Sequence, residues 1–161
     1  MKYLTIELPF GSRFIEIEVP TRNLIAIVEP RQVQAVVDGS GETELALRNP
    51  IGEERISSLV KKGSKVVVLS EDNTRPTPVR EILHPILREL NGCGLRDEDI
   101  TAIMALGTHR PMTEKEMSMK LGEEIAERIE VVNHDCENPE SLEDLGKTSR
   151  GTPIFVNKAA F

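Results

Sequence analysis

Two apolar segments, each followed by a compact polar loop, place the strongest constraint on the fold of this chain. "KVVVLS" (residues 65–70) is a continuous run rich in β-branched residues, typical of a strand covered on both faces. "DITAIMAL" (99–106) is a second such segment. Between them, "PVREILHPILREL" (78–90) carries apolar residues at the i, i+3, i+4 spacing of an amphipathic helix. This alternation predicts an α/β fold with a largely parallel, Rossmann-like sheet flanked by helices.

The amino-terminal part predicts a β-hairpin. "YLTIEL" (3–8) and "RFIEIEV" (13–19) alternate apolar and polar side chains, with proline, glycine and serine between them. "NLIAIVEP" (23–30) predicts another short extended piece. The segment 31–52 predicts a helix in two parts around Gly39 and Gly41, and 55–64 predicts a short helix stopped by a glycine.

The carboxy-terminal part predicts further strands. "RIEVVNH" (128–134) and "TPIFVN" (152–157) are a third and a fourth strand, and "ENPESLED" (137–144) suits a solvated loop and helix start. Thr113 and Glu116 have the spacing of a capping box at the start of a helix after the second strand. The chain stops soon after an apolar strand, so we expect a domain or fragment of a longer protein.

Size and charge narrow the class of protein. The 161 residues suit one well-cored domain, so we expect residues 1–161 to form a single α/β domain. The formal charge of −7 disfavours nucleic acid as a partner, because phosphate binding needs a basic face. No apolar run reaches the roughly 18 residues of a membrane helix, and the start does not resemble a signal peptide. We therefore expect a cytoplasmic protein without a membrane partner, and free thiols at Cys93 and Cys136.

The polar loops after the first two buried strands carry the candidate site. "SEDNTRP" holds Asp72, Thr74 and Arg75, and "GTHRP" holds Thr108 and His109. Ligands of parallel sheets gather beyond the carboxyl ends of the strands, where both loops fall. His109 suits acid/base work at neutral pH, Asp72 suits an orienting carboxylate, and Arg75 suits an anion. The set predicts proton transfer on a small anionic substrate.

Each of these residues also has a purely structural interpretation. His109 suits hydrogen bonding within a turn, and Asp72 suits capping of its own turn. Arg75 suits an ion pair with Glu71 or another acid. The hydroxyls of the two threonines suit turn stabilisation as well as ligand binding. His84 and His134 are best interpreted as structural, the first inside a helix and the second in a turn.

Several motifs taken together resemble a known family. "EDNTRPTP", "ALGTHRPMTEKEM", "VVNHD" and "LGKTSRGTPIFVNK" are similar, in this order, to the N-terminal domain of the nickel-dependent lactate racemase family. The resemblance runs from Asn49 to the end of the chain. The pairing of Asp-x-Thr-Arg-Pro with Gly-Thr-His-Arg is its most specific feature.

The resemblance implies an isomerase that interconverts stereoisomers of a small 2-hydroxy acid. It implies a nickel-pincer nucleotide that takes hydride from C2 of the substrate and returns it to either face, while two histidines exchange the hydroxyl proton. His109 corresponds to one of these histidines, Asp72 to its partner and Arg75 to a group that binds the substrate carboxylate. Thr74 and Thr108 are weaker candidates for contacting the cofactor.

The same resemblance implies that part of the catalyst lies elsewhere. The family's cofactor-tethering lysine, nickel-ligating histidine and second catalytic histidine come later in the polypeptide, so no metal ligand is assigned to this chain. Neither Lys147 nor Lys158 is assigned the tethering role. The expected partners are a small 2-hydroxy carboxylate and a C-terminal domain of the same polypeptide.

Two other hypotheses remain beside the racemase. The chain is alternatively a stand-alone module that binds a small anion or nucleotide without turnover, or a scaffold with a vestigial pocket. The racemase hypothesis predicts that Asp72 and His109 lie within hydrogen-bond reach. It also predicts that Arg75 faces the same crevice.

Overall fold

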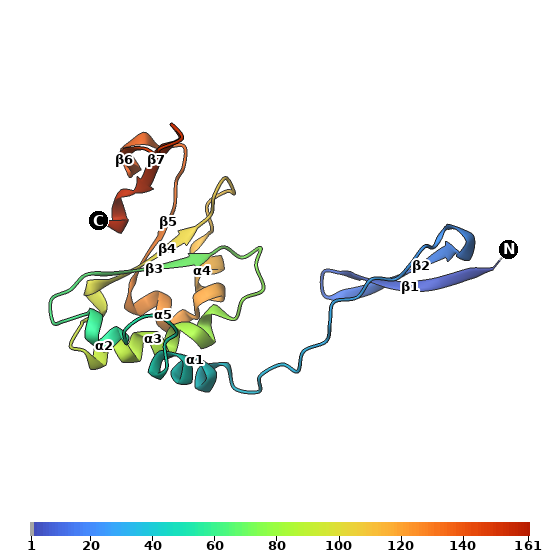
Figure 1. The fold of residues 1–161 in the computed structure, drawn as a ribbon, viewed down its shortest axis with the longest axis horizontal. Coiled ribbons are helices and arrows are strands. Elements are labelled where there is room, and N and C mark those ends of the chain that lie inside the picture. Colours follow the sequence, from blue (N-terminus) through green and yellow to red (C-terminus); the bar gives the residue numbers. More distant parts are fainter. Residues whose placement is uncertain (1) are drawn as a thin grey trace. The chain divides into compact units, whose positions relative to one another are not determined.

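The computed structural model describes residues 2–161, which divide into two compact units, one up to Ala35 and one from Val36 to Phe161 (Figure 1). In the first unit, β1 (Tyr3–Phe10) and β2 (Arg13–Pro20) form the predicted antiparallel hairpin, followed by a short 3-10 helix. The hairpin prediction is confirmed. That residues 1–161 form one domain stays a prediction.

The segment between the hairpin and Gly39 differs from its prediction. No strand is found at 24–30, and residues 31–38 are not helical. The first helix, α1 (Gly39–Arg48), instead begins at the glycines that were expected to separate two helical parts, with the Asp38 side chain accepting a hydrogen bond from the Gly41 N–H. The valines of 31–38 are exposed, so no packed apolar face stabilises a helix there.

The second unit contains a parallel sheet flanked by helices. Its strands lie in the order β3-β4-β5, with β3 (Val66–Glu71), β4 (Ile100–Ala105) and β5 (Glu130–Asn133). The helices are α1, α2 (Ile56–Leu59), α3 (Val79–Gly92), α4 (Glu114–Leu121) and α5 (Glu123–Arg128). They lie together on one side of β3 and β4 in Figure 1.

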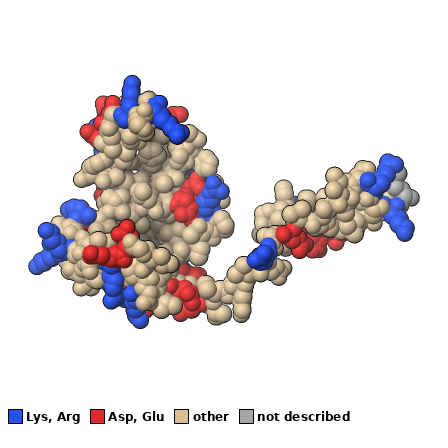
Figure 2. Space-filling view, viewed as in Figure 1, with Lys and Arg blue, Asp and Glu red and all other residues tan. Residues whose placement is uncertain are grey.

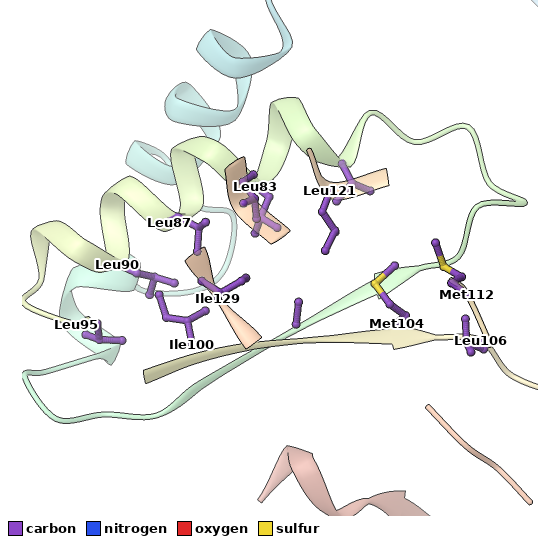
Figure 3. Packing of buried hydrophobic residues seen from close by; sticks show 13 residues of the cluster. Leu83, Leu87, Leu90, Leu95, Ile100, Met104, Leu106, Met112, Leu121 and Ile129 are labelled. Carbon is purple, nitrogen blue, oxygen red and sulfur yellow. The ribbon is translucent and has the colours of Figure 1, made fainter. Parts of the chain in front are cut away.

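The core forms between these helices and one face of the sheet. Leu83, Leu87 and Leu90 of α3 point toward Ile100 and Met104 of β4 (Figure 3). All five are 2% exposed or less, as the amphipathic spacing of α3 requires. On the other face of β3, Leu69 is 69% exposed. The expectation that β3 is covered on both faces is therefore wrong at Leu69 for the residues described here.

A proline inside α3 explains how α1 docks. Pro85 has no N–H, so it cannot donate to the carbonyl of Glu81 four residues earlier. The Ser40 hydroxyl of α1 donates to that carbonyl at 3.0 Å. A hydroxyl of α1 thus replaces the backbone hydrogen bond that Pro85 removes from α3.

The fourth predicted strand exists but does not join the parallel sheet. β7 (Pro153–Asn157) pairs antiparallel with β6 (Leu142–Lys147) in a separate two-stranded sheet. The acidic stretch 137–144, expected to be a loop and helix start, holds a 3-10 helix (Pro139–Ser141) and then enters β6. Figure 2 shows acidic and basic side chains of this unit in small groups with a broad uncharged area between them. None of the helices formed by residues 2–161 is long and apolar enough to cross a bilayer.

Candidate active site

The two predicted site loops start at the same edge of the parallel sheet. Ser70 lies opposite Met104 and Glu71 opposite Ala105, so β3 and β4 end side by side. Asp72 follows β3 directly, and the loop of His109 follows β4. Parallel pairing therefore brings together two segments 37 residues apart in the sequence.

Asp72 and His109 are joined by a hydrogen bond between Nδ1 of the imidazole and Oδ2 of the carboxylate. The other carboxylate oxygen, Oδ1, accepts from the Thr74 N–H at 3.0 Å and from the Thr74 hydroxyl at 2.6 Å. Asp72 is 4% exposed, whereas the side chain of His109 is 56% exposed. The predicted Asp72–His109 contact is confirmed, and the turn-capping interpretation of Asp72 holds as well.

These hydrogen bonds determine the charge of Asp72. The bond with His109, followed by those with Thr74, lowers the pKa of Asp72 to about 2. Asp72 is therefore ionised at neutral pH and accepts only, so Nδ1 of His109 must be the donor. In neutral His109 the proton then sits on Nδ1, which leaves the lone pair of Nε2 for a ligand.

Arg75 lines the same pocket as this pair. The pocket has a volume of about 310 Å³. It is lined by Glu71, Asp72, Thr74, Arg75, Ala105, Leu106, Gly107, Thr108 and His109. Arg75 is exposed there, and across residues 2–161 no ion pair joins it to Glu71. The alternative of an Arg75–Glu71 pair is wrong, because Glu71 pairs with Lys120 at 3.0 Å.

The two threonines differ in what they offer a ligand. The hydroxyl proton of Thr74 is donated to Asp72, which is the turn-stabilising role, and leaves its oxygen to accept. Thr108 is exposed at the pocket. Gly107, at a φ of 60°, occupies the left-handed region that favours glycine and turns the chain sharply before Thr108.

Three polar side chains hold the loops in place, a role that the sequence did not predict for any of them. The Asn133 amide donates to the Met112 carbonyl at 2.9 Å and accepts from the Met112 N–H at 3.1 Å. Glu116, predicted only as a capping residue, confirms that role and also binds Arg110 beside His109. Lys120 reaches the loop after β3. The sequence offered only weak signals for these roles. Asn133 is a polar residue at the end of a strand, and Glu116 and Lys120 are polar residues on a helix that packs against the core.

The remaining histidines and cysteines do not line the pocket of Asp72 and His109. His134 Nδ1 is 3.2 Å from Asn157 Nδ2, and Nε2 of His84 is 3.9 Å from a Glu124 oxygen, so both make structural contacts. Cys93 and Cys136 are free thiols, as predicted. Residues 2–161 contain no group of three or more His, Cys, Asp or Glu side chains arranged to hold a metal ion.

Comparison with known proteins identifies relatives over nearly the whole chain. The family model described as the lactate racemase N-terminal domain matches residues 10–161. A lactate racemase of Thermoanaerobacterium thermosaccharolyticum is 31% identical over 157 residues, and one of Lactiplantibacillus plantarum is 29% identical over 159. The alignments cover 96% and 98% of this chain but 37% of each relative, so the chain spans little more than a third of their length.

A solved structure agrees with this similarity. The lactate racemase apoprotein from T. thermosaccharolyticum superposes with a TM-score of 0.74 at 28% identity, over 96% of this chain and 36% of that chain. The similarity thus extends from the sequence to the arrangement of the elements.

Proposed function

We propose, since the chain belongs to the lactate racemase N-terminal domain family, that it carries substrate-binding and proton-transfer residues of an enzyme interconverting stereoisomers of a small 2-hydroxy acid. One observation carries this proposal: Asp72 and His109 are hydrogen bonded at the edge of the parallel sheet, and Arg75 lines the same pocket. The relatives named lactate racemase make lactate the first substrate to test.

The roles of the three residues follow from their chemistry. The guanidinium of Arg75 pairs with the substrate carboxylate through two parallel N–H···O bonds. Nε2 of His109 takes the proton of the C2 hydroxyl as a general base. The ionised Asp72 holds the imidazole in the required tautomer and stabilises the imidazolium that forms.

Removal of the hydroxyl proton alone does not racemise a 2-hydroxy acid. When the hydroxyl proton goes to His109, the C2 hydrogen must leave with its electron pair, and a planar 2-oxo acid results. Return of hydride to the opposite face and of the proton to oxygen gives the other stereoisomer. A nickel-pincer nucleotide, the cofactor that the family resemblance implies, would supply the hydride acceptor.

The residue of this pocket that fits the anionic part of such a nucleotide is Thr108. Its exposed hydroxyl suits phosphate or carboxylate oxygens, while Arg75 is assigned to the substrate carboxylate. No nickel ligand is assigned among the described residues. We propose that the ligands, the tethering lysine and the second histidine come from a C-terminal domain of the same polypeptide, and that the sheet belongs to a Rossmann-like layer of that longer enzyme.

The test uses the polypeptide that contains this chain, purified from its own cells and supplied with nickel. Its intact mass is measured first, and a mass more than double 17.9 kDa is expected. Chiral chromatography then follows conversion of L- to D-lactate with substrate deuterated at C2. Hydride transfer retains the deuterium in the product, whereas abstraction of a C2 proton exchanges it with solvent.

Substitution of the histidine separates the proposed role from a structural one. His109→Ala is expected to lower kcat by about 10²–10⁴-fold, the usual contribution of a general base. His84→Ala, a histidine outside the pocket, is the matched control and should retain activity. A mass near 17.9 kDa with carboxylate binding but no interconversion would contradict the racemase and support the stand-alone binding module.

A further inference from the structure

The side chain of Lys120 is buried although it lies at the periphery of the site. It is 7% exposed, while that of Lys65, another lysine in an ion pair, is 73% exposed. Lysine is rarely buried unless its ammonium is paired, because desolvation of a charge is costly. Burial of Lys120 therefore requires a reason in its contacts.

The hydrogen bonds of the Lys120 ammonium all go to Glu71, at the end of β3, and to the loop after it, which holds Asp72 and Arg75. Nζ donates to Oε1 of Glu71 at 3.0 Å, to the carbonyl of Arg75 at 2.7 Å and to that of Thr77 at 3.3 Å. An ammonium has three protons, so these three acceptors use all of them. Lys120 thus holds the loop both before Asp72 and after Arg75.

The loop has few backbone hydrogen bonds of its own. Arg75 and Thr77 each precede a proline, and a proline has no N–H to donate. Within the loop, the Arg75 N–H donates to the Asp72 carbonyl at 3.3 Å and the Val79 N–H to the Thr77 carbonyl at 2.8 Å. Lys120 supplies the donors that a proline-rich segment lacks.

The same helix also holds the loop of His109. Glu116 lies one turn before Lys120 on α4, so the two side chains share a face. Glu116 binds Arg110 of the second loop at 2.6 and 2.8 Å and accepts from Asn73 of the first loop at 3.1 Å. One face of α4 therefore contacts both loops of the site.

We propose that Lys120 is a positioning residue, which fixes the backbone of residues 71–77 so that Asp72 meets His109 and Arg75 presents its guanidinium to the pocket. Lys120 does not line the pocket, so it acts through Arg75 and Asp72. That Lys120 raises the affinity for a carboxylate rests on the proposed function of Arg75. That Lys120 fixes the backbone of residues 71–77 does not depend on that function.

The test compares Lys120→Met, which removes the charge and donors at similar length, with Lys115→Met, an exposed lysine of the same helix. Hydrogen–deuterium exchange of the whole chain is measured first. In Lys120→Met the amides of Thr74, Arg75 and Val79, the first residue of α3, are expected to exchange at least about tenfold faster, while β4 and the rest of α3 stay protected. The Nδ1–H resonance of His109, observed by NMR, should weaken or disappear. Lys115→Met should change neither signal.

A conservative variant and a binding probe complete the design. Lys120→Arg keeps the charge and should recover at least half of the loop protection. Should Lys120→Met not fold, Glu71→Gln removes one charged partner, and a smaller rise in exchange confined to the loop is expected. Unchanged loop exchange, or an equal rise throughout α3 and β4, would overturn the proposal.

Sodium L-lactate separates this inference from the proposed function. If Arg75 binds carboxylate, Lys120→Met should weaken lactate binding about tenfold, as when the competent loop is populated to roughly a tenth. If lactate binding is equal in the native chain and in Arg75→Met, the role of Arg75 is refuted. Exchange of the loop amides still decides the role of Lys120 in that case.

Discussion

Replacing Asn133 by alanine should lower the free energy of unfolding of the larger unit, because it removes two hydrogen bonds to a buried backbone segment. The Asn133 side chain makes two hydrogen bonds to the backbone of Met112, at 2.9 and 3.1 Å. Each bond of this kind contributes about 1 kcal/mol net. Met112 is 4% exposed, so its N–H and carbonyl lose partners with little access to water. We expect the free energy of unfolding to fall by about 2–3 kcal/mol.

The assay follows urea unfolding by circular dichroism at 222 nm. The five α-helices found in residues 2–161 all belong to the unit that starts at Val36, so the helical signal reports on that unit. The midpoint should shift at unchanged slope, and the thermal midpoint should fall by about 4–10 °C for a chain of this size. Asn73→Ala, which removes one exposed hydrogen bond at 3.1 Å, is the control and should cost less than about 0.5 kcal/mol.

A loss for Asn133→Ala no greater than for the control would refute this reasoning. It would mean that water replaces the amide at Met112, and that the loop between β4 and α4 does not depend on Asn133. A changed slope would instead indicate that the unfolding is not two-state.

Two further predictions concern the core and the acid range. Leu87→Ala, at a fully buried position, should lower the free energy of unfolding by about 2–5 kcal/mol, measured by the same urea titration; a loss below 1 kcal/mol would contradict the packing seen for α3. Hydrogen bonds lower the pKa of Asp72 and of Glu116 to about 2, with His109 and Arg110 as the respective main partners, from ordinary values of 3.8 and 4.5. Because both carboxylates bind protons more weakly when folded, their stabilising contribution is present above pH 4.5 and is lost as the pH falls toward 2. In Asp72→Asn the urea midpoint should fall less steeply between pH 4.5 and pH 2 than in the native chain. Parallel plots of midpoint against pH for the two proteins would show that the hydrogen bond between Asp72 and His109 does not contribute to stability.

Several features of this protein follow from local sequence alone. Continuous apolar runs predicted β3 and β4, and the apolar spacing of residues 78–90 predicted α3. Burial leaves such local patterns in the sequence, a run for a covered strand and a helical spacing for a helix with one buried face. The two site loops were also predicted from local sequence, as polar segments that directly follow two apolar strands. Parallel strands place their carboxyl ends at one edge, so two polar loops at strand ends predict one site.

Features that depend on distant partners could not be predicted in this way. The valines of 31–38 have helical spacing, but they are exposed, and the first helix begins only after Asp38, which caps α1. "TPIFVN" predicts a strand, yet its antiparallel pairing with β6 depends on a partner without a strand signal. Which strand a segment pairs with depends on both segments, so the sequence of either one alone does not predict the pairing.

The residues that support the site show the same division. Asp72, Arg75 and His109 were identified by type and by position at strand ends, and the structure adds that Asp72 and His109 share a hydrogen bond. Lys120 is an ordinary lysine in a helix until tertiary structure places it 2.7 Å from a carbonyl 45 residues away. The sequence by itself indicated the groups for which we propose the chemistry. Only the tertiary structure decided what holds them, because those contacts join residues whose separation leaves no local pattern.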